Sequence, residues 1–241
     1  MSGHSKWSNI KNRKGKQDAA KGKIFTKMAK LIAVAAREGG ADPEMNAKLR
    51  EAVAKAKAFN MPNDNVDRAI KKGSGELSGV VFEEINYEGY GPGGVAVIVS
   101  ALTDNKNRTA ADVRHAFDKN GGNLGTNGCV AFMFTKMGRI LIEKSDSLDE
   151  EELLNIALEA GAEDMLTSEE GYTIITAPED FSLVLEGLNS NGVDVLSGEV
   201  AMVPSTETSL DDLDVKKMEK MLDMFDDNDD IQEVWHNWSE E

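Results

Sequence analysis

The chain has 241 residues, a formal net charge of −16 and 40% hydrophobic residues, enough for a packed core and too many for a wholly disordered protein. Its one cysteine, Cys129, excludes an internal disulfide, and three histidines beside it do not make the usual structural zinc site. No run approaches the roughly 20 apolar residues of a membrane span, and the N-terminus lacks the apolar core of a secretory signal. We therefore expect a cytoplasmic protein with no membrane partner and no metal site.

The charge is unevenly distributed along the chain. Residues 1–79 hold 17 Lys and Arg against 8 Asp and Glu, a net charge of +9, whereas residues 80–241 hold 10 against 35, a net charge of −25. The first thirty residues contain nine Lys and Arg and a single acid, Asp18. This asymmetry favours nucleic-acid binding by the basic end. Solvated lysines on an ordinary helical domain are the alternative.

The basic end divides into an arm and three helices. Residues 1–16 show no apolar periodicity and predict an arm that is mobile when free. From Asp18 to Gly39, apolar residues recur at helical spacing. Asp42 and Pro43 predict the N-cap and first position of a second helix, and a third follows Pro62. We expect a domain over residues 1–79.

The rest of the chain alternates short strands with helices. Strands are expected at 80–88, 94–102 and 130–135 with a helix at 107–119, and a last helix and strand at 211–226 and 231–238. Between them, residues 139–203 have the order β-α-β-β-α-β of the ferredoxin-like fold. The expected fold class is therefore α+β, with two α/β domains after the helices. The predicted boundaries are 80–136 plus 205–241 for a discontinuous middle domain and 137–204 for an inserted ferredoxin-like domain.

Two glycine clusters have the glycine content of phosphate-binding loops. Gly89, Gly91 and Gly94 match the dinucleotide fingerprint, but Pro92 interrupts it and a β-branched strand follows instead of a helix. We interpret it as a tight turn between strands. The second cluster, at residues 121–128, lies between a helix and a strand, where a turn explains it and a contact loop for RNA or protein remains the alternative.

No motif indicates catalysis. Asp226–Asp230 begins like a calcium loop, but Ile231 and Asn237 stand where glycine and glutamate are needed, so a solvated acidic turn is expected. Cys129 is interpreted as a small core residue, and its distance from His115 is no evidence for a dyad. We expect no enzymatic activity, no cofactor and no small-molecule substrate.

Lysines and arginines of the first thirty residues are interleaved with an aromatic residue and amides. Each cation can neutralise a phosphate, and Trp7 can either stack on an unpaired base or pack against the first helix. No helix-turn-helix recognition helix is evident. The predicted nucleic-acid-binding residues are Lys6, Trp7, Lys11, Arg13, Lys14, Lys16, Lys21, Lys23 and Lys27.

These residues belong to longer motifs that resemble the YebC/PmpR family over essentially the whole chain. The motifs are Met1–Lys14 (MSGHSKWSNIKNRK), Lys21–Lys27, Met61–Ile70, Tyr87–Gly94, Thr103–Thr109 and Gly122–Gly125. Cys129 departs from the pattern, in which a serine is common. The resemblance implies a three-domain cytoplasmic protein without enzymatic activity, either a DNA-binding transcriptional regulatory protein or a ribosome-associated translation factor that relieves stalling on proline-rich stretches.

Both functions remain open at this point. Basic residues spread over an arm suit recognition of RNA shape, whereas the usual description of the family favours DNA. The expected function is therefore a DNA-binding regulator, with binding of ribosomal RNA by the arm as the alternative. A protein-interaction scaffold with a merely solubilising arm is a third reading.

Overall fold

The structure, a computed structural model, describes residues 6–75, 82–145 and 148–239, with the backbone alone for residues 6–21 and for Ala58. The described residues form two compact units. The larger contains residues 12–131 and 208–239, and the smaller contains the described residues 6–11 and 132–207. The finer domain boundaries given above stay a prediction.

The described chain begins with three helices, which belong to the larger unit from residue 12 on: α1 (Lys6–Gly39), α2 (Ala47–Ala58) and α3 (Asn63–Gly73). Their facing apolar stripes bury a common core that includes Ile32, Leu49 and Val66. A Cβ at Gly73 would overlap the carbonyl oxygen of Ala33, so the end of α3 approaches the α1 backbone too closely for any side chain.

The prediction that helix begins only near Asp18 is wrong, because residues 6–16 continue α1 toward the N-terminus; residues 1–5 lie outside the described part of the chain, and the mobility of the arm stays a prediction. Residues 6–16 contain no proline and are rich in Lys and Arg, which have good helix propensity. Because a helix already nucleated by the buried residues after Asp18 extends at little cost, local propensity is enough to carry it further.

The start of the second helix also differs from the prediction. Asp42 accepts a hydrogen bond from the Glu44 N–H at 2.9 Å, but this stabilises a turn before the helix. The N-cap is the buried Asn46, whose Oδ1 accepts from the Leu49 N–H at 3.1 Å and whose Nδ2 donates to the Ala35 carbonyl at 2.8 Å. One amide therefore ends α1 and starts α2, and this tertiary role outweighs the local signal of Asp42.

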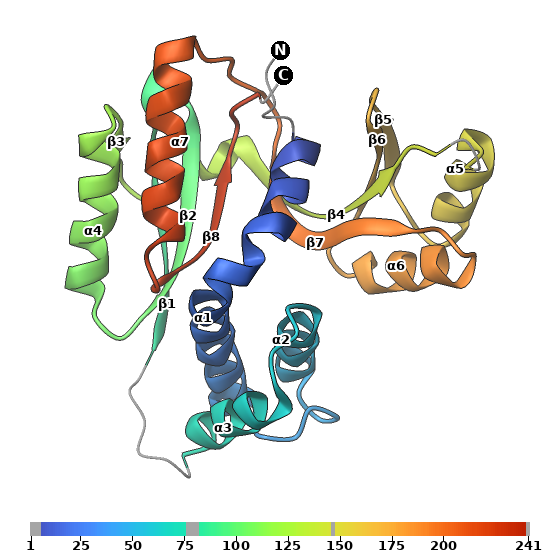
Figure 1. The fold of residues 1–241 in the computed structure, drawn as a ribbon, viewed down its shortest axis with the longest axis horizontal. Coiled ribbons are helices and arrows are strands. Elements are labelled where there is room, and N and C mark those ends of the chain that lie inside the picture. Colours follow the sequence, from blue (N-terminus) through green and yellow to red (C-terminus); the bar gives the residue numbers. More distant parts are fainter. Residues whose placement is uncertain (1–5, 76–81, 146–147, 240–241) are drawn as a thin grey trace. The chain divides into compact units, whose positions relative to one another are not determined.

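A four-stranded antiparallel sheet completes the larger unit, in the order β3-β1-β2-β8. Its strands and helices are β1 (Glu83–Tyr90), β2 (Ala96–Thr103), α4 (Lys106–Lys119), β3 (Asn123–Leu124), α7 (Asp212–Asp226) and β8 (Ile231–His236). Figure 1 shows α4 and α7 side by side over one face, where the rings of Phe117 and Phe225 meet edge to face with centroids 5.5 Å apart. The last strand of the chain thus completes a sheet begun by β1.

The glycine motif between β1 and β2 is a tight turn, as predicted. Residues Pro92–Gly94 make a short 3₁₀ turn, and Gly93 has a φ of +63°. A Cβ on Gly93 would also overlap the side chain of Leu210, which precedes α7. Gly93 therefore serves the packing of the turn. The motif is followed by β2, whereas a dinucleotide-binding fingerprint opens a helix.

The smaller unit has the ferredoxin-like arrangement predicted from the sequence. Its elements are β4 (Phe134–Glu143), α5 (Glu150–Glu159), β5 (Asp164–Thr167), β6 (Gly171–Thr176), α6 (Phe181–Ser190) and β7 (Val195–Pro204). The sheet is antiparallel in the order β5-β6-β4-β7. The separate strand predicted at 130–135 is wrong, because Ala131–Met133 form a 3₁₀ turn and β4 begins at Phe134 and runs on without a break. The α+β class is confirmed.

Candidate nucleic-acid interface

All nine predicted nucleic-acid-binding residues lie on one helix. Seven of them, on the first part of α1, are described by their backbone alone: Lys6, Trp7, Lys11, Arg13, Lys14, Lys16 and Lys21. With about 3.6 residues per turn, positions 13, 16, 23, 27 and 30 follow one another along one side of α1, and positions 7, 11, 14 and 21 fall on the opposite side. The structure thus places the backbone of all nine predicted residues in α1.

The described lysines of α1 face an acidic turn at the end of α7, residues Asp226–Asp230. Lys23 Nζ donates to Asp227 Oδ1 at 2.6 Å, and Lys27 Nζ donates to the Asp226 carbonyl at 3.1 Å, with Asp226 Oδ1 at 3.9 Å. The hydrogen bond from Lys23 and the nearby acidic charges raise the pKa of its ammonium group. Two predicted phosphate contacts are therefore engaged by the acidic turn of the same chain, Lys23 by a carboxylate and Lys27 by a backbone carbonyl.

Asp230 is the centre of this contact and is 5% exposed. Lys30 Nζ donates to its Oδ1 at 2.7 Å, while Arg108 Nη2 and Thr109 Oγ1 donate to its Oδ2 at 2.6 and 2.9 Å. Thr103 Oγ1 adds a fourth contact at 3.1 Å. Burial by itself would raise the pKa of Asp230, but the hydrogen bonds outweigh it and lower the pKa from 3.8 to about 2.

The expectation of a solvated acidic turn is wrong for Asp230 and holds for its neighbours. The side chains of Asp226 and Asp227 are 71% and 75% exposed, although both lie near lysines of α1. A buried acid needs donors from elsewhere in the fold, and Asp230 takes them from α1, the end of β2 and α4. Sequence distance hides this relation, since Lys30 and Asp230 are 200 residues apart.

Further contacts join the three helices to the rest of the larger unit. Lys55 of α2 pairs with Glu233 of β8, and Arg37 donates to the carbonyl of Phe82 at 2.9 Å. The ammonium groups of Lys30 and Lys72 lie 5.5 and 5.8 Å from the centroid of the Phe82 ring, within cation–π range. Cations of all three helices are therefore used in intramolecular contacts, which the sequence analysis did not anticipate.

The second glycine cluster is organised by Glu88, a buried carboxylate on β1. It accepts hydrogen bonds from the backbone N–H groups of Gly128, Val130 and Ala131 at 2.7–3.0 Å. Burial by itself would raise the pKa of Glu88, but these three donors lower it below the usual range. The loop is thus fixed by its own chain, and contact with RNA or protein stays a prediction.

The residues that sequence reasoning missed are Lys30, Glu88, Arg108 and Asp230. Arg108 lies within the motif Thr103–Thr109, which was recognised as a family pattern without a physical role. The structure supplies that role, because both threonines and the arginine of the motif bind one carboxylate. A seven-residue polar motif at a strand–helix junction was the available signal.

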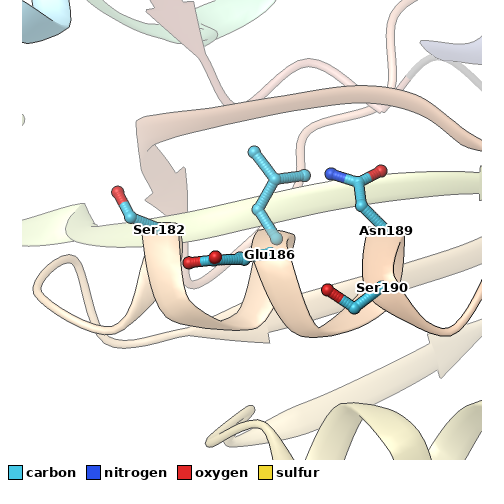
Figure 2. A pocket seen from close by; sticks show the side chains of 5 residues that line it. Ser182, Glu186, Asn189 and Ser190 are labelled. Atoms are coloured by element: carbon cyan, nitrogen blue, oxygen red, sulfur yellow. The ribbon is translucent and has the colours of Figure 1, made fainter.

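Features of other site types are few in the described part of the chain. A shallow hollow runs along α6, and its described lining residues are Ser182, Leu185, Glu186, Asn189 and Ser190. Figure 2 shows that the labelled side chains project from this one helix, so groups from different elements do not converge there. Among the described residues, no group of three or more His, Cys, Asp and Glu is placed to hold a metal ion, and no helix is long and apolar enough to cross a membrane.

Comparison with known proteins covers nearly the whole chain. Residues 5–76 match the model of the TACO1/YebC protein N-terminal domain, and residues 82–238 match that of the TACO1/YebC second and third domain. A relative named as a probable transcriptional regulatory protein of Clostridioides difficile is 61% identical over 97% of this chain and 98% of its own. One of the same description from Acetivibrio thermocellus is 57% identical over both full lengths.

A solved structure agrees with these matches. The crystal structure of a conserved hypothetical protein from Aquifex aeolicus superposes with a TM-score of 0.81 at 46% identity, covering 93% of each chain. The family resemblance seen in the sequence is thereby confirmed by sequence models and by fold. The chain belongs to the TACO1/YebC family.

Proposed function

We propose that this protein is a non-enzymatic, cytoplasmic nucleic-acid-binding regulator, and specifically a DNA-binding transcriptional regulatory protein that contacts phosphates through α1. The observation that carries the proposal is the charge distribution: nine Lys and Arg within the first thirty residues, almost all on one helix, in a chain of net charge −16. The names of the relatives support a role in transcription. The acidic remainder repels the same polyanion, so docking occurs by one end.

The α2–α3 pair is a poorer candidate for reading DNA. A recognition helix contacts base edges with its N-terminal residues, which must approach the phosphates closely. The exposed side chains at the start of α3 include Asp64 and Asp67, and Arg68, Lys71 and Lys72 come only later. Because carboxylates at the leading end oppose phosphates, we assign the contact to α1 and expect weak sequence preference.

A ribosome-associated translation factor is the second candidate. Predicted contact positions fall on opposite sides of α1, with 13 and 16 on one side and 11 and 14 on the other. This distribution suits a helix with phosphates on more than one side, as in folded RNA. In this reading α1 binds ribosomal RNA, and the protein relieves stalling on proline-rich stretches.

Salt-dependent binding to a labelled DNA duplex tests the first proposal. Replacing Lys11, Arg13 and Lys14 by Ala should lower the affinity and reduce the slope of log K against log salt by about 0.9 for each lost phosphate contact. The matched control removes three exposed cations from the acidic part, by Lys119→Ala, Lys216→Ala and Lys220→Ala. An unchanged slope in the α1 variant would refute the assignment.

Sedimentation of the tagged protein from lysate separates the two candidates. Migration with ribosomes that survives DNase and is lost in the α1 variant supports the translation factor. Fast sedimentation that DNase abolishes supports the DNA-binding regulator. Protein that stays at the top of the gradient in every sample contradicts both and favours a scaffold.

A further inference from the structure

The acidic turn lies on the lysines of α1 in the geometry that a phosphate backbone would need. Lys23, Lys27 and Lys30 follow one another at spacings of four and three residues, so their ammonium groups form a row along the helix. Oxygens of Asp226, Asp227 and the Asp229–Asp230 segment meet that row one lysine after another. Carboxylates of Asp227 and Asp230 and backbone carbonyls of Asp226 and Asp229 thus already occupy the row, with the Asp226 carboxylate 3.9 Å from Lys27.

The ion pairs along the row differ in how exposed they are to solvent. Lys30 and Asp230 have side chains that are 14% and 7% exposed, and three further donors fix the carboxylate, so this pair anchors the turn. The Lys23–Asp227 pair is 49% and 75% exposed. Exposed ion pairs contribute little stability and weaken with salt. The anchored end therefore holds the carboxylate of Asp227 exchangeably on Lys23, and that of Asp226 lies 3.9 Å from Lys27, whose side chain is 12% exposed.

The position of the exposed acids is unfavourable for the helix that carries them. Asp226 is the last residue of α7 and Asp227 its C-cap, and the last turn contains no basic residue. The C-terminal end of a helix carries a partial negative charge, so acids there are repelled. Lys23 and Lys27 offset this repulsion. The carboxylates of Asp226 and Asp227 therefore do not stabilise α7 itself.

We propose that the Asp226–Asp230 turn is an internal competitor for nucleic acid: anchored by Asp230 on Lys30, it occupies Lys23 and Lys27 of α1 until a phosphate backbone displaces Asp226 and Asp227. The inference rests on the proposed nucleic-acid binding and names its regulation. A polyanion can bind these lysines only by displacing the carboxylates, so a single phosphate group binds poorly. A duplex that also contacts positions 13 and 16, on the same side of α1, makes enough additional contacts to displace the carboxylates.

Neutralising the exposed acids tests the competitor. The double variant Asp226→Asn, Asp227→Asn keeps Asp230 and its donors, so the anchor stays in place. Its affinity for a labelled DNA duplex at low salt should rise by about 1.4- to 5-fold, as expected for the loss of the exposed Lys23–Asp227 ion pair. The slope of log K against log salt should steepen by about 0.9 for each lysine newly available to phosphate.

Two matched variants isolate the local effect. Glu169→Gln with Glu179→Gln makes the same change in net charge at exposed positions of the smaller unit and should leave the slope unchanged. Adding Lys23→Ala and Lys27→Ala to the double variant should abolish the gain. A gain that survives this addition, or an equal gain in the control, overturns the competitor.

The same measurements distinguish failure of the competitor from failure of the proposed nucleic-acid binding. If the double variant binds like the unmodified protein while loss of Lys11, Arg13 and Lys14 weakens binding, the function stands and the competitor is refuted. If no variant binds the duplex at any salt concentration, both are refuted. Thermal unfolding of each variant checks that the fold is retained.

Discussion

Asp230 brings together residues of three elements: Lys30 from α1, Thr103 from the end of β2, and Arg108 and Thr109 from α4. A buried carboxylate with these donors stabilises the fold only while the set is complete, because each unpaired buried group costs free energy. The residue is thus a structural junction, and its neighbours in sequence are not.

Asp230→Asn should lower the free energy of unfolding by about 2–4 kcal/mol, since it leaves the nearly buried ammonium group of Lys30 without a counter-charge. Urea unfolding followed by tryptophan fluorescence reports the change, because Trp235 and Trp238 lie on or beside β8. Asp229→Asn is the control and should change the value by less than about 0.5 kcal/mol. Equal effects of the two substitutions would contradict the role of Asp230.

Acid should weaken the same junction. The pKa of Asp230 is lowered from 3.8 to about 2 in the folded protein, so its carboxylate favours folding above about pH 4. This contribution, roughly 2 kcal/mol, is lost as the pH falls through about 2. Unfolding measured between pH 5 and pH 2 in urea should therefore be less pH-dependent in Asp230→Asn than in the unmodified protein.

At the scale of elements, amphipathic helices and alternating strands were predictable and their termini were less so. Val113 and Phe117 in α4, and Met218 and Phe225 in α7, recur at helical spacing and are buried as that spacing predicts. The first turns of α1 contain only Trp7 and Ile10 as large apolar residues, so their helix could be expected only from propensity and from extension of the later turns. No local signal could choose Asn46 over Asp42 as the cap, because the choice depends on the end of α1.

The clustering of the candidate residues was predictable, and their environment was not. Clustered cations identify a basic segment from the sequence, since charge counts need no fold. Lys23 and Asp227 are 204 residues apart, and nothing local to either indicates that they meet. Long-range ion pairs of this kind become visible only when the last strand is placed in its sheet.

Two glycines of the helical part should respond in opposite directions to alanine. At Gly73 a Cβ would overlap the backbone of Ala33, so Gly73→Ala should cost about 1–3 kcal/mol by forcing α3 away from α1. At Gly22, in α1, nothing lies within 4 Å of an added Cβ, and Gly22→Ala should stabilise by about 0.5–1 kcal/mol through helix propensity. Thermal unfolding followed by helical circular dichroism measures both. A Gly73→Ala variant as stable as the unmodified protein would refute the close approach.

For the whole molecule, charge segregation matters more than the net charge. A protein of net charge −16 should bind an anion exchanger, yet its basic helix should also retain it on heparin. Replacing Lys11, Arg13 and Lys14 by Ala should lower the salt concentration that elutes the protein from heparin and should raise that for the anion exchanger. Unchanged elution from heparin would show that the basic end does not act as a unit.

The pairing of β2 with β8 has a consequence for synthesis of the chain. The ribosome makes α1 first, and the residues that pair with its lysines, Asp226 to Asp230, are among the last. A chain interrupted before them leaves Lys30 without its carboxylate and β2 with a bare edge open to other strands. A copy that lacks β8 is therefore more cationic at its surface and more prone to aggregate than one that contains it. Both properties change once Asp230 pairs with Lys30 and β8 pairs with β2.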